Sequence, residues 1–361
     1  MGEPAPIDVR APLLAWYDAN RRDLPWRRTR DPYRILVAEV LLQRTRVASG
    51  VPYYERFLAR FPTVRDLAAA PLDDVLAAWE GLGFYRRAKH LHAAAQAIVN
   101  RHGGTVPRSY EVLAALPGIG PYTAGAIASI AFGLPVPAVD GNVTRVISRL
   151  FRIRSDVTRP PARRRLAELA ADLVSVDRAG AFNQAMMELG ATICTPVSPA
   201  CERCPVEGLC LARAAGEERE IPLSGRRAAV RTVRVAFALI EAKGRVLLVR
   251  RKPGELLGGL WSLPGGEIPP ERPERESVRE LVKEQTGVAV NIRSRWAPIE
   301  RTFSHRKWSG SIYRGAPPQE PPRSHGDIRW IPISEALRLP LVPFHRDAIR
   351  SLGGLEAFEG R

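Results

Sequence analysis

The strongest constraint in this sequence is the spacing of its cysteines. All four lie within seventeen residues, at positions 194, 201, 204 and 210, in the pattern C-x6-C-x2-C-x5-C. Thiols are rarely gathered so closely in a reducing compartment unless they bind a metal. Four thiolates suit either one tetrahedral zinc ion or a [4Fe–4S] cluster. We therefore expect the chain to fold so that this loop closes around a metal centre.

The hydrophobic pattern divides the chain into two parts. Up to residue 212 the apolar residues recur at helical spacing, in segments 35–47, 72–79, 86–99, 122–132, 143–150, 163–174 and 181–189. Residues 213–231 are charged and are expected to form a linker. From 232 to 361 the segments 233–240, 245–251, 288–293, 299–303 and 328–331 are typical of strands, and 274–285 of a helix. Lys243-Gly244 is typical of a hairpin turn. The pattern predicts an all-α domain, 1–212, followed by an α+β domain, 232–361.

The composition favours a polyanionic partner. The chain has 54 Lys and Arg against 38 Asp and Glu, a formal net charge of +16. Such an excess suits binding to phosphates, although it is also found where charge serves solubility alone. The most apolar stretch, 114–139, is interrupted by prolines, and residues 1–30 show no signal peptide. A cytoplasmic, intracellular protein without a membrane span is predicted, with a monomer as the default.

A glycine-rich turn between two helical segments is the second strong motif. Gly118 and Gly120 stand in the sequence Leu116-Pro117-Gly118-Ile119-Gly120-Pro121-Tyr122-Thr123-Ala124. Glycines allow the backbone to turn tightly there. The helix that follows presents its first amides and the positive end of its dipole to the same point. The motif predicts an anion site, and on a basic helical protein the anion is expected to be a DNA phosphate.

Two carboxylates stand in positions that suit catalysis. Glu39 lies between Ala38 and Val40 in an apolar segment, so burial is expected to raise its pKa. Asp140 directly precedes a predicted helix, where aspartate commonly serves as the N-cap. One protonated and one ionised carboxyl group together provide a general acid and a stabiliser of positive charge. A solvent-facing Glu39 and a purely structural Asp140 are the alternatives.

Together these motifs resemble the adenine DNA glycosylase (MutY) family of the endonuclease III superfamily, over essentially the whole chain. The resemblance is carried by the hairpin at about 110–132, the cysteine loop 194–210 and the segment Val37-Ala38-Glu39-Val40-Leu41-Leu42-Gln43. It implies a helix-hairpin-helix glycosylase domain and a [4Fe–4S] cluster held by Cys194, Cys201, Cys204 and Cys210. The implied activity is hydrolysis of the N-glycosyl bond of adenine paired with 8-oxoguanine or guanine, in base excision repair associated with the nucleoid. The implied partner is double-stranded DNA.

The resemblance also implies roles for individual residues. Glu39 would protonate adenine N7, and Asp140 would stabilise the oxocarbenium-like sugar, with Tyr122 and Asn142 beside it. Tyr122 stands where bifunctional relatives have a lysine nucleophile, so an abasic product is expected. Expected contacts with DNA or the extruded adenine come from Arg22, Trp26, Gln43, Arg44, Thr45, Leu82, Phe84, Gly118, Gly120 and Gln184. Arg44 and Phe84 depart from the Gln and Tyr that are usual in the family.

The C-terminal part resembles a Nudix domain with a damaged hydrolase motif. The motif is partly satisfied by Gly265, Glu271, Arg279, Glu280 and Glu284. Lys283 takes the place of one of the paired carboxylates that would hold Mg²⁺, Gln285 follows Glu284, and the spacing to Gly287 is one residue too long. A recognition domain without hydrolysis is therefore expected. Phe303, Ser304 and His305 match a loop with which the family recognises oxidised guanine, and Ser304 would distinguish its protonated N7.

Three other functions are kept as alternatives. An endonuclease III-like glycosylase for oxidised pyrimidines is opposed by Tyr122. A Nudix nucleotide hydrolase fused to a DNA-binding module is opposed by the damaged motif. A non-catalytic DNA-binding protein is opposed by the presence of both Glu39 and Asp140.

Overall fold

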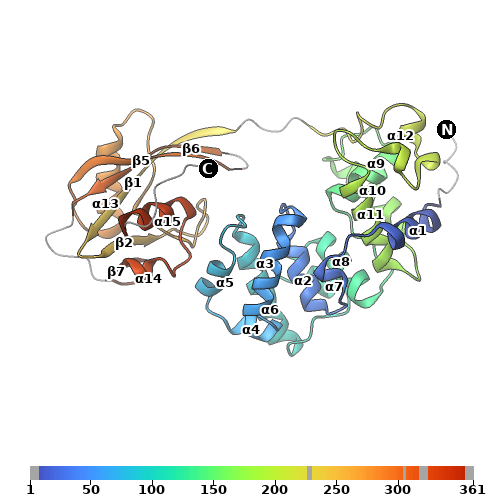
Figure 1. Ribbon diagram of the computed structural model, residues 1–361, viewed down its shortest axis with the longest axis horizontal. Helices are drawn as coiled ribbons and strands as arrows, with labels where there is room; N and C mark the ends of the chain where they lie inside the picture. The colour runs from blue at the N-terminus through green and yellow to red at the C-terminus, as the bar shows by residue number, and fades with distance from the viewer. Residues whose placement is uncertain (1–7, 226–229, 304–305, 317–323, 354–361) are drawn as a thin grey trace. The chain divides into compact units, whose positions relative to one another are not determined.

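The computed structural model describes residues 8–225, 230–303, 306–316 and 324–353. The chain divides into two compact units, labelled by element in Figure 1. The first unit comprises residues 1–70 and 86–226, and the second comprises residues 71–85 and 227–361. The segment 71–85, which the sequence pattern assigns to the helical domain, is thus part of the second unit.

All regular elements in the described residues of the first unit are helices, as the sequence predicts. None of its helices, nor any other described helix, is long and apolar enough to cross a membrane. Its α-helices are α1 (Arg10–Asn20), α2 (Pro32–Leu41), α3 (Val47–Arg60), α4 (Val64–Ala69), α6 (Arg86–His102), α7 (Tyr110–Ala114), α8 (Pro121–Phe132), α9 (Gly141–Leu150), α10 (Pro160–Leu173), α11 (Ala179–Thr192) and α12 (Leu211–Ala214). Short 3-10 turns are η1 (Pro25–Arg27), η2 (Cys201–Arg203) and η3 (Glu207–Leu209).

Four of these helices, α2, α8, α9 and α11, bring the predicted catalytic region together. Small and apolar residues make up most of α8, which is buried from Thr123 to Ser129, as expected for a helix enclosed by protein. α8 packs against α2 and α11, and α11 also packs against α1 and α9 (Figure 1). At Gly125 an added Cβ would lie 2.1 Å from the carbonyl oxygen of Pro137. Such small residues allow the elements that carry the site to approach closely.

The prediction of one helix over 35–47 is wrong. α2 ends at Leu41 and α3 begins at Val47. Between them Arg44 has a φ of 61°, which an α-helix cannot contain. The buried guanidinium of Arg87 donates to the carbonyl oxygens of Leu41, at 2.7 Å, and of Gln43. The apolar spacing continues across the turn, and the sequence pattern does not reveal that a residue from α6 holds the turn open.

The second unit is a mixed sheet with helices, in agreement with the predicted α+β class. Its strands are β1 (Arg231–Ala242), β2 (Arg245–Arg250), β3 (Trp261–Ser262), β4 (Gly265–Glu267), β5 (Ile292–Thr302), β6 (Arg306–Gly315) and β7 (Ile328–Pro332). Its helices are α5 (Leu72–Ala78), α13 (Glu274–Thr286), α14 (Ile333–Ala336), α15 (Pro343–Arg350) and the 3-10 turn η4 (Ser351–Gly353). The strand order is β3-β2-β1-β6-β5, with β4 paired to β1 and β7 paired to β2. α13 packs on β1, where Val278 and Val282 join the core.

Two local predictions for this sheet are confirmed and one is wrong. Lys243 and Gly244, both at positive φ, connect the antiparallel strands β1 and β2 as the expected hairpin turn. The expected helix over 274–285 is α13. The expected separate strands 288–293 and 299–303 are instead one strand, β5.

The strand β6 was missed by sequence reasoning. It contains Ser309, Gly310 and Ser311, which are poor strand formers. It forms because β1 offers a parallel partner along its whole length, from Arg231 opposite Arg306 to Ile240 opposite Gly315. The partner therefore decides the conformation more than the local sequence does.

The expected linker, 213–231, includes residues that pack on the first unit. Glu217 is held by the guanidinium groups of Arg152, at 2.6 Å and 2.9 Å, and of Arg154. The backbone N–H of Val157 donates to Leu223 O at 3.0 Å. Residues up to about 225 thus continue the first unit, and β1 begins at Arg231.

Replacing Gly310 by alanine is expected to destabilise the second unit. A Cβ at this position would lie 1.8 Å from the carbonyl oxygen of Val235 on β1, and neither backbone can move without disturbing the parallel ladder. We expect the free energy of unfolding to fall by about 2 kcal/mol or more. Gly266→Ala is the matched control, because a Cβ there meets nothing within 4 Å and should change stability by less than about 0.5 kcal/mol. Urea unfolding followed by tryptophan fluorescence tests both, and equal effects of the two changes would contradict the expectation.

Candidate active site

Glu39 is the buried carboxylic acid at the centre of the site. It lies on α2 with 7% of its surface exposed. Burial raises its pKa to about 7, and the negative charge of Asp140 adds to the rise, whereas the hydrogen bond from Tyr122 opposes it. The Tyr122 hydroxyl, on α8, donates to Glu39 Oε2 at 2.5 Å and also lies 3.5 Å from Met187 Sδ. The predicted rise of the Glu39 pKa is confirmed, and the solvent-facing alternative is wrong.

Asp140 is the N-cap of α9, as expected from its place in the sequence. One carboxylate oxygen accepts a hydrogen bond from the Val143 N–H at 2.7 Å, and the other accepts from Asn142 Nδ2 at 2.9 Å. Burial raises the pKa of Asp140, while these two N–H donors oppose that rise. The helix dipole adds to them in favouring the ionised form. The two carboxyl groups therefore differ in their donors: an O–H for Glu39, and two N–H groups for Asp140.

Arg145 links Asp140 to the cysteine loop. Its guanidinium donates to Asn142 Oδ1 at 2.8 Å, and Asn142 in turn holds Asp140. The same guanidinium donates to the carbonyl oxygens of Cys194 at 2.8 Å and Gly190 at 2.7 Å. At Gly190 an added Cβ would lie 2.6 Å from Asn142 Cβ, so the start of α9 rests closely on α11. The position of Asp140 thus depends on the loop that begins at Cys194.

A second buried carboxylate, Glu188 on α11, holds two arginines of the N-terminal segment. Arg22 donates to both of its oxygens at 2.7 Å, and Arg27 donates to one of them at 2.7 Å. The Glu188 side chain is 1% exposed. Burial alone would raise its pKa, but the hydrogen bonds from Arg22 and Arg27 outweigh burial and lower it to about 2. Arg27 also lies 5.4 Å from the Tyr17 ring centroid and lowers the pKa of Glu39. This ion pair network fixes the segment around Trp26.

The residues predicted to contact adenine lie on separate elements of the first unit. Trp26, in η1, is buried and packs edge-on against Tyr54 at 5.3 Å, so its core role is clear. Arg22 is engaged by Glu188, as described above. Gln184 lies on α11, three residues before Met187, and its side chain is half-buried with Nε2 3.3 Å from Gly180 O. Gln43 donates to the Thr123 hydroxyl at 3.2 Å and so ties the turn after α2 to α8.

The predicted DNA-facing turns have the geometry that the sequence indicates. Gly118 has a φ of 72°, and an added Cβ would lie 2.3 Å from His90 Cβ, so only glycine fits. Gly120 is the exposed N-cap of α8, and the first amides of that helix open toward this turn. Arg44 is exposed at positive φ between the half-buried Gln43 and Thr45. These features fit the predicted anion site.

Other predicted contacts belong to the second unit. Leu82 and Phe84 follow α5, and Phe84 is 47% exposed. Phe303 directly follows β5 and packs edge-on against the buried Trp308, with the ring centroids 5.3 Å apart. Ser304 and His305 lie outside the described residues.

The helix α13, which carries Arg279, Glu280 and Glu284 of the Nudix-like motif, is tied to β4 by a neutral side chain. Gln285 donates to Gly265 O at 3.0 Å and accepts from Gly265 N–H at 2.8 Å. This neutral amide therefore ties α13 to β4, next to Glu284. Glu280 pairs with the exposed Arg272 at 2.5 Å. The arrangement supports a structural role for this helix.

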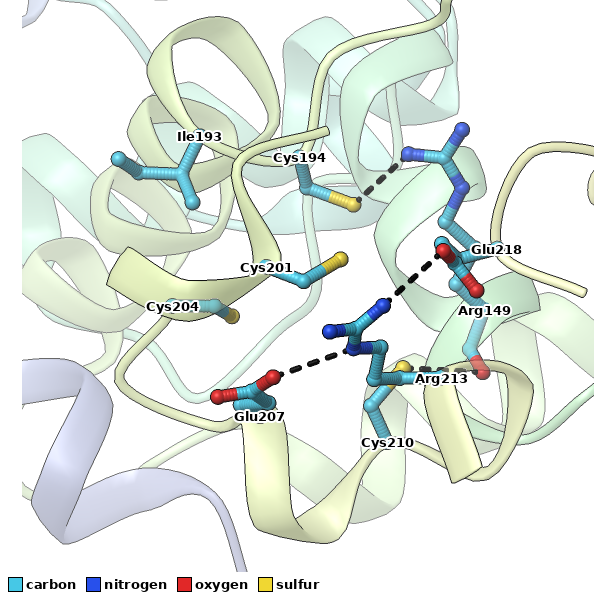
Figure 2. A pocket seen from close by; sticks show the side chains of 9 residues that line it. All are labelled: Arg149, Ile193, Cys194, Cys201, Cys204, Glu207, Cys210, Arg213 and Glu218. Carbon is cyan, nitrogen blue, oxygen red and sulfur yellow. Dashed lines mark hydrogen bonds and ion pairs between the residues drawn. The ribbon is translucent and has the colours of Figure 1, made fainter. Parts of the chain in front are cut away.

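The four cysteines surround one cavity, which Figure 2 shows together with Arg149 and Arg213. Arg149 is 1% exposed, and it donates to Cys194 Sγ at 3.2 Å and to Thr195 O at 2.8 Å. Burial raises the pKa of Cys204 to about 12, which favours the protonated thiol, so a metal that binds there must displace the proton. An iron–sulfur cluster with four thiolate ligands carries a net negative charge, and the two guanidinium groups beside the cysteines would offset it. The cavity therefore fits such a cluster.

Several residues of the site were missed by sequence reasoning. Glu188 and Arg27 meet from positions 161 residues apart, and no local pattern joins them. Met187 is an ordinary apolar residue in the sequence. Arg145 carries the one available signal: a cation in the first turns of a helix opposes the dipole, so it needs another reason to be there.

Comparisons with known proteins agree with this geometry. Residues 37–172 match the HhH-GPD superfamily of base excision DNA repair proteins, 194–210 the iron-sulfur binding domain of endonuclease III, and 235–351 the NUDIX domain. The adenine DNA glycosylase of Rattus norvegicus is 36% identical over 90% of this chain and 74% of its own length. That of Homo sapiens is 37% identical over 84% of this chain, which spans 66% of the human protein. A solved thermostable thymine-DNA glycosylase is 34% identical, with a TM-score of 0.53, over 57% of this chain and 94% of its own.

Because residues 194–210 match the iron-sulfur binding domain of endonuclease III, this loop holds a [4Fe–4S] cluster, and the zinc alternative is set aside.

Replacing Glu188 by glutamine is expected to destabilise the first unit. The change leaves two arginines facing a neutral amide, and loss of one partner from a buried ion pair costs on the order of 3 kcal/mol. Because the pKa of Glu188 is lowered to about 2, its contribution is present above the unfolded value of 4.5 and is lost as the pH falls from there toward 2. Chemical unfolding at neutral pH measures the loss, and the difference from the unaltered chain should shrink as the pH is lowered through this range.

Asp23→Asn is the control, since its pair with Arg28 is exposed on both sides. An effect of Glu188→Gln no larger than that of the control would contradict the expectation.

Proposed function

The chain belongs to the adenine DNA glycosylase family, and we propose that it removes adenine from duplex DNA in which the opposite base is 8-oxoguanine or guanine. The observation that carries the proposal is the pairing of a buried, hydrogen-bonded Glu39 with Asp140 at a helix N-terminus. All of these groups come from one unit of one chain, which supports action as a monomer.

The chemistry assigns a different task to each carboxyl group. Adenine is a poor leaving group as an anion, so a proton must reach N7 as the C1′–N9 bond breaks and its electron pair moves to the base. Glu39, with a pKa of about 7, holds that proton in a site from which water is largely excluded. Asp140 is ionised and stabilises the positive charge that develops on the sugar. Water then adds to C1′, and the product is an abasic site with the strand intact.

Tyr122 decides between hydrolysis and strand cleavage. A lyase needs an amine at this place to attack C1′ and form a Schiff base. The Tyr122 hydroxyl donates to Glu39, and burial raises the pKa of the phenol well above its usual value, so it stays neutral. Its role is to orient the acid. This favours the monofunctional glycosylase over an oxidised-pyrimidine lyase.

Contacts with DNA are proposed for the exposed turns of both units. Adenine must leave the base stack for N7 and C1′ to be reached, and Trp26, Arg22 and Gln184 are proposed to receive it. The amides at Gly118 and Gly120 are proposed to bind a backbone phosphate. Gln43, Arg44 and Thr45 are proposed to contact the strand beside the mispair. Asn142 is proposed to orient Asp140 against the sugar.

The second unit is proposed to read the base opposite adenine. Ser304 would accept a hydrogen bond from the N7–H that distinguishes 8-oxoguanine from guanine, beside Phe303 and His305. Leu82 and Phe84 are proposed to contact the same base pair. Lys283, in the place of one of the carboxylates that would hold Mg²⁺, supports recognition without nucleotide hydrolysis.

Single-turnover cleavage of a duplex with adenine opposite 8-oxoguanine tests the proposal. We expect strand breaks only after hot alkali, because an abasic site is the product. Glu39→Gln should abolish adenine release, while the control Glu55→Gln, an exposed glutamate on α3, should leave it unchanged. Breaks without alkali would favour a lyase. Release of damaged pyrimidines instead of adenine would overturn the proposal.

The pH dependence of the chemical step provides a separate test of Glu39 as the acid. Its acid form is present below a pKa of about 7 and is lost as the pH rises through that value. The single-turnover rate constant should therefore fall about tenfold for each pH unit above it. Tyr122→Phe removes the hydrogen bond that lowers this pKa, so the fall should begin at a higher pH. Tyr53→Phe on α3 is the matched control, and a rate that does not depend on pH around neutrality would contradict the assignment.

A further inference from the structure

The segment 71–85 joins the second unit although it lies between α4 and α6 of the first unit in sequence. It contains α5 and the turn Gly81-Leu82-Gly83-Phe84-Tyr85 that follows it. Two ion pairs, one at each end of α5, bind it to the sheet and to α15.

The first pair joins Asp73 to Arg250 on β2. Arg250 donates to Asp73 Oδ1 at 2.9 Å and to Oδ2 at 2.7 Å, a two-pronged contact that fixes orientation as well as distance. The indole N–H of Trp261, which is fully buried, lies 3.4 Å from Asp73 Oδ2. The Arg250 guanidinium also stacks on the Trp261 ring, 4.6 Å from its centroid. Less than a third of either charged side chain is exposed, so solvent screens the pair only in part.

The second pair joins Glu80, just after α5, to Arg346 on α15. Arg346 is almost buried, and its guanidinium donates to the carbonyl oxygens of Leu337 and, at 2.7 Å, Leu339. Burial raises the pKa of Glu80, and Arg346 opposes that rise. The carbonyl oxygens of Leu337 and Leu339 thus fix the Arg346 guanidinium independently of its pair with Glu80. The two pairs fix both ends of a helix of only seven residues.

The turn after α5 has a conformation that must be held by its surroundings. Gly81 and Gly83 have φ of 89° and 67°, and Phe84 has φ of 47°, which is costly for an aromatic residue. The fully buried Trp79 donates its indole N–H to Gly83 O at 3.2 Å and so anchors the turn to the interior of the protein. Nearly half of Phe84 is exposed, and it is among the few large apolar side chains exposed on the described residues. An aromatic ring held in this way suits stacking on a nucleobase.

We propose that the Asp73–Arg250 and Glu80–Arg346 pairs are positioning contacts through which the second unit sets the place of Phe84 and Leu82, and thereby the preference for 8-oxoguanine over guanine opposite adenine. The inference rests on the proposed function, in which the second unit and this turn read the same base. Neither pair includes a residue that is proposed to contact DNA, so both are expected to act through the turn.

A double-mutant cycle in the full chain tests the first pair. Asp73→Asn, Arg250→Gln and the double variant are compared for single-turnover adenine release opposite 8-oxoguanine and opposite guanine. Each single change should lower the ratio of the two rates about tenfold, which corresponds to about 1.4 kcal/mol. The rate opposite guanine should stay the same. The double variant should lose no more than either single variant, since both remove the same contact.

Arg272→Gln is the matched control in the same unit, because its pair with Glu280 is exposed on both sides. An unchanged ratio in the single variants, or additive losses in the double variant, would overturn the inference. Equal losses opposite both bases would also overturn it, because they would indicate a general loss of structure. Absence of adenine release by the unaltered chain would instead overturn the proposed function, and this inference with it.

Discussion

The first unit depends on keeping one carboxyl group out of water between helices. An isolated Glu39 carboxylate would be costly to bury, and the protein resolves this by letting its pKa rise to about 7 and by giving it one hydroxyl donor. That solution requires α2 and α8 to lie close enough for Tyr122 to reach across. The small residues of α8 allow close packing, and Gly125 lets the segment that leads to Asp140 lie against the same helix. The protonation of Glu39 and the close packing of α2 on α8 therefore depend on each other.

Buried and half-buried arginines carry out much of the remaining organisation. Arg87 holds the turn after α2, Arg145 joins Asn142 to the start of the cysteine loop, and Arg149 holds that loop at Cys194 and Thr195. In each case one planar guanidinium group meets carbonyl oxygens that no regular element can satisfy. The loops that carry function are thus fixed from behind by side chains of neighbouring helices. Their geometry does not depend on their own sequence alone.

This explains what the sequence could and could not predict. The cysteine loop, the Gly118–Gly120 turn and the N-cap Asp140 are local motifs, and the structure has them as expected. The turn at Arg44 and the strand β6 were missed, because each is imposed by a distant partner, Arg87 or β1. The same holds for Glu188, whose role appears only when the N-terminal segment folds back on α11. Periodicity and spacing predict the conformation that a segment favours by itself. They do not show contacts with residues that are distant in the sequence.

The assignment of residues 71–85 to the second unit follows the same logic. Taken alone, α5 is too short to be stable, so its position must come from what it binds. An apolar contact would hold the helix but would tolerate sliding and rotation. A two-pronged carboxylate–guanidinium pair at one end, with a second ion pair at the other, specifies both position and rotation. Charge pairs of this kind add little net stability, so their value lies in the geometry that they define. This geometry determines the position of Phe84, whose side chain is half exposed and whose backbone has a positive φ. A mobile turn would not keep that backbone conformation.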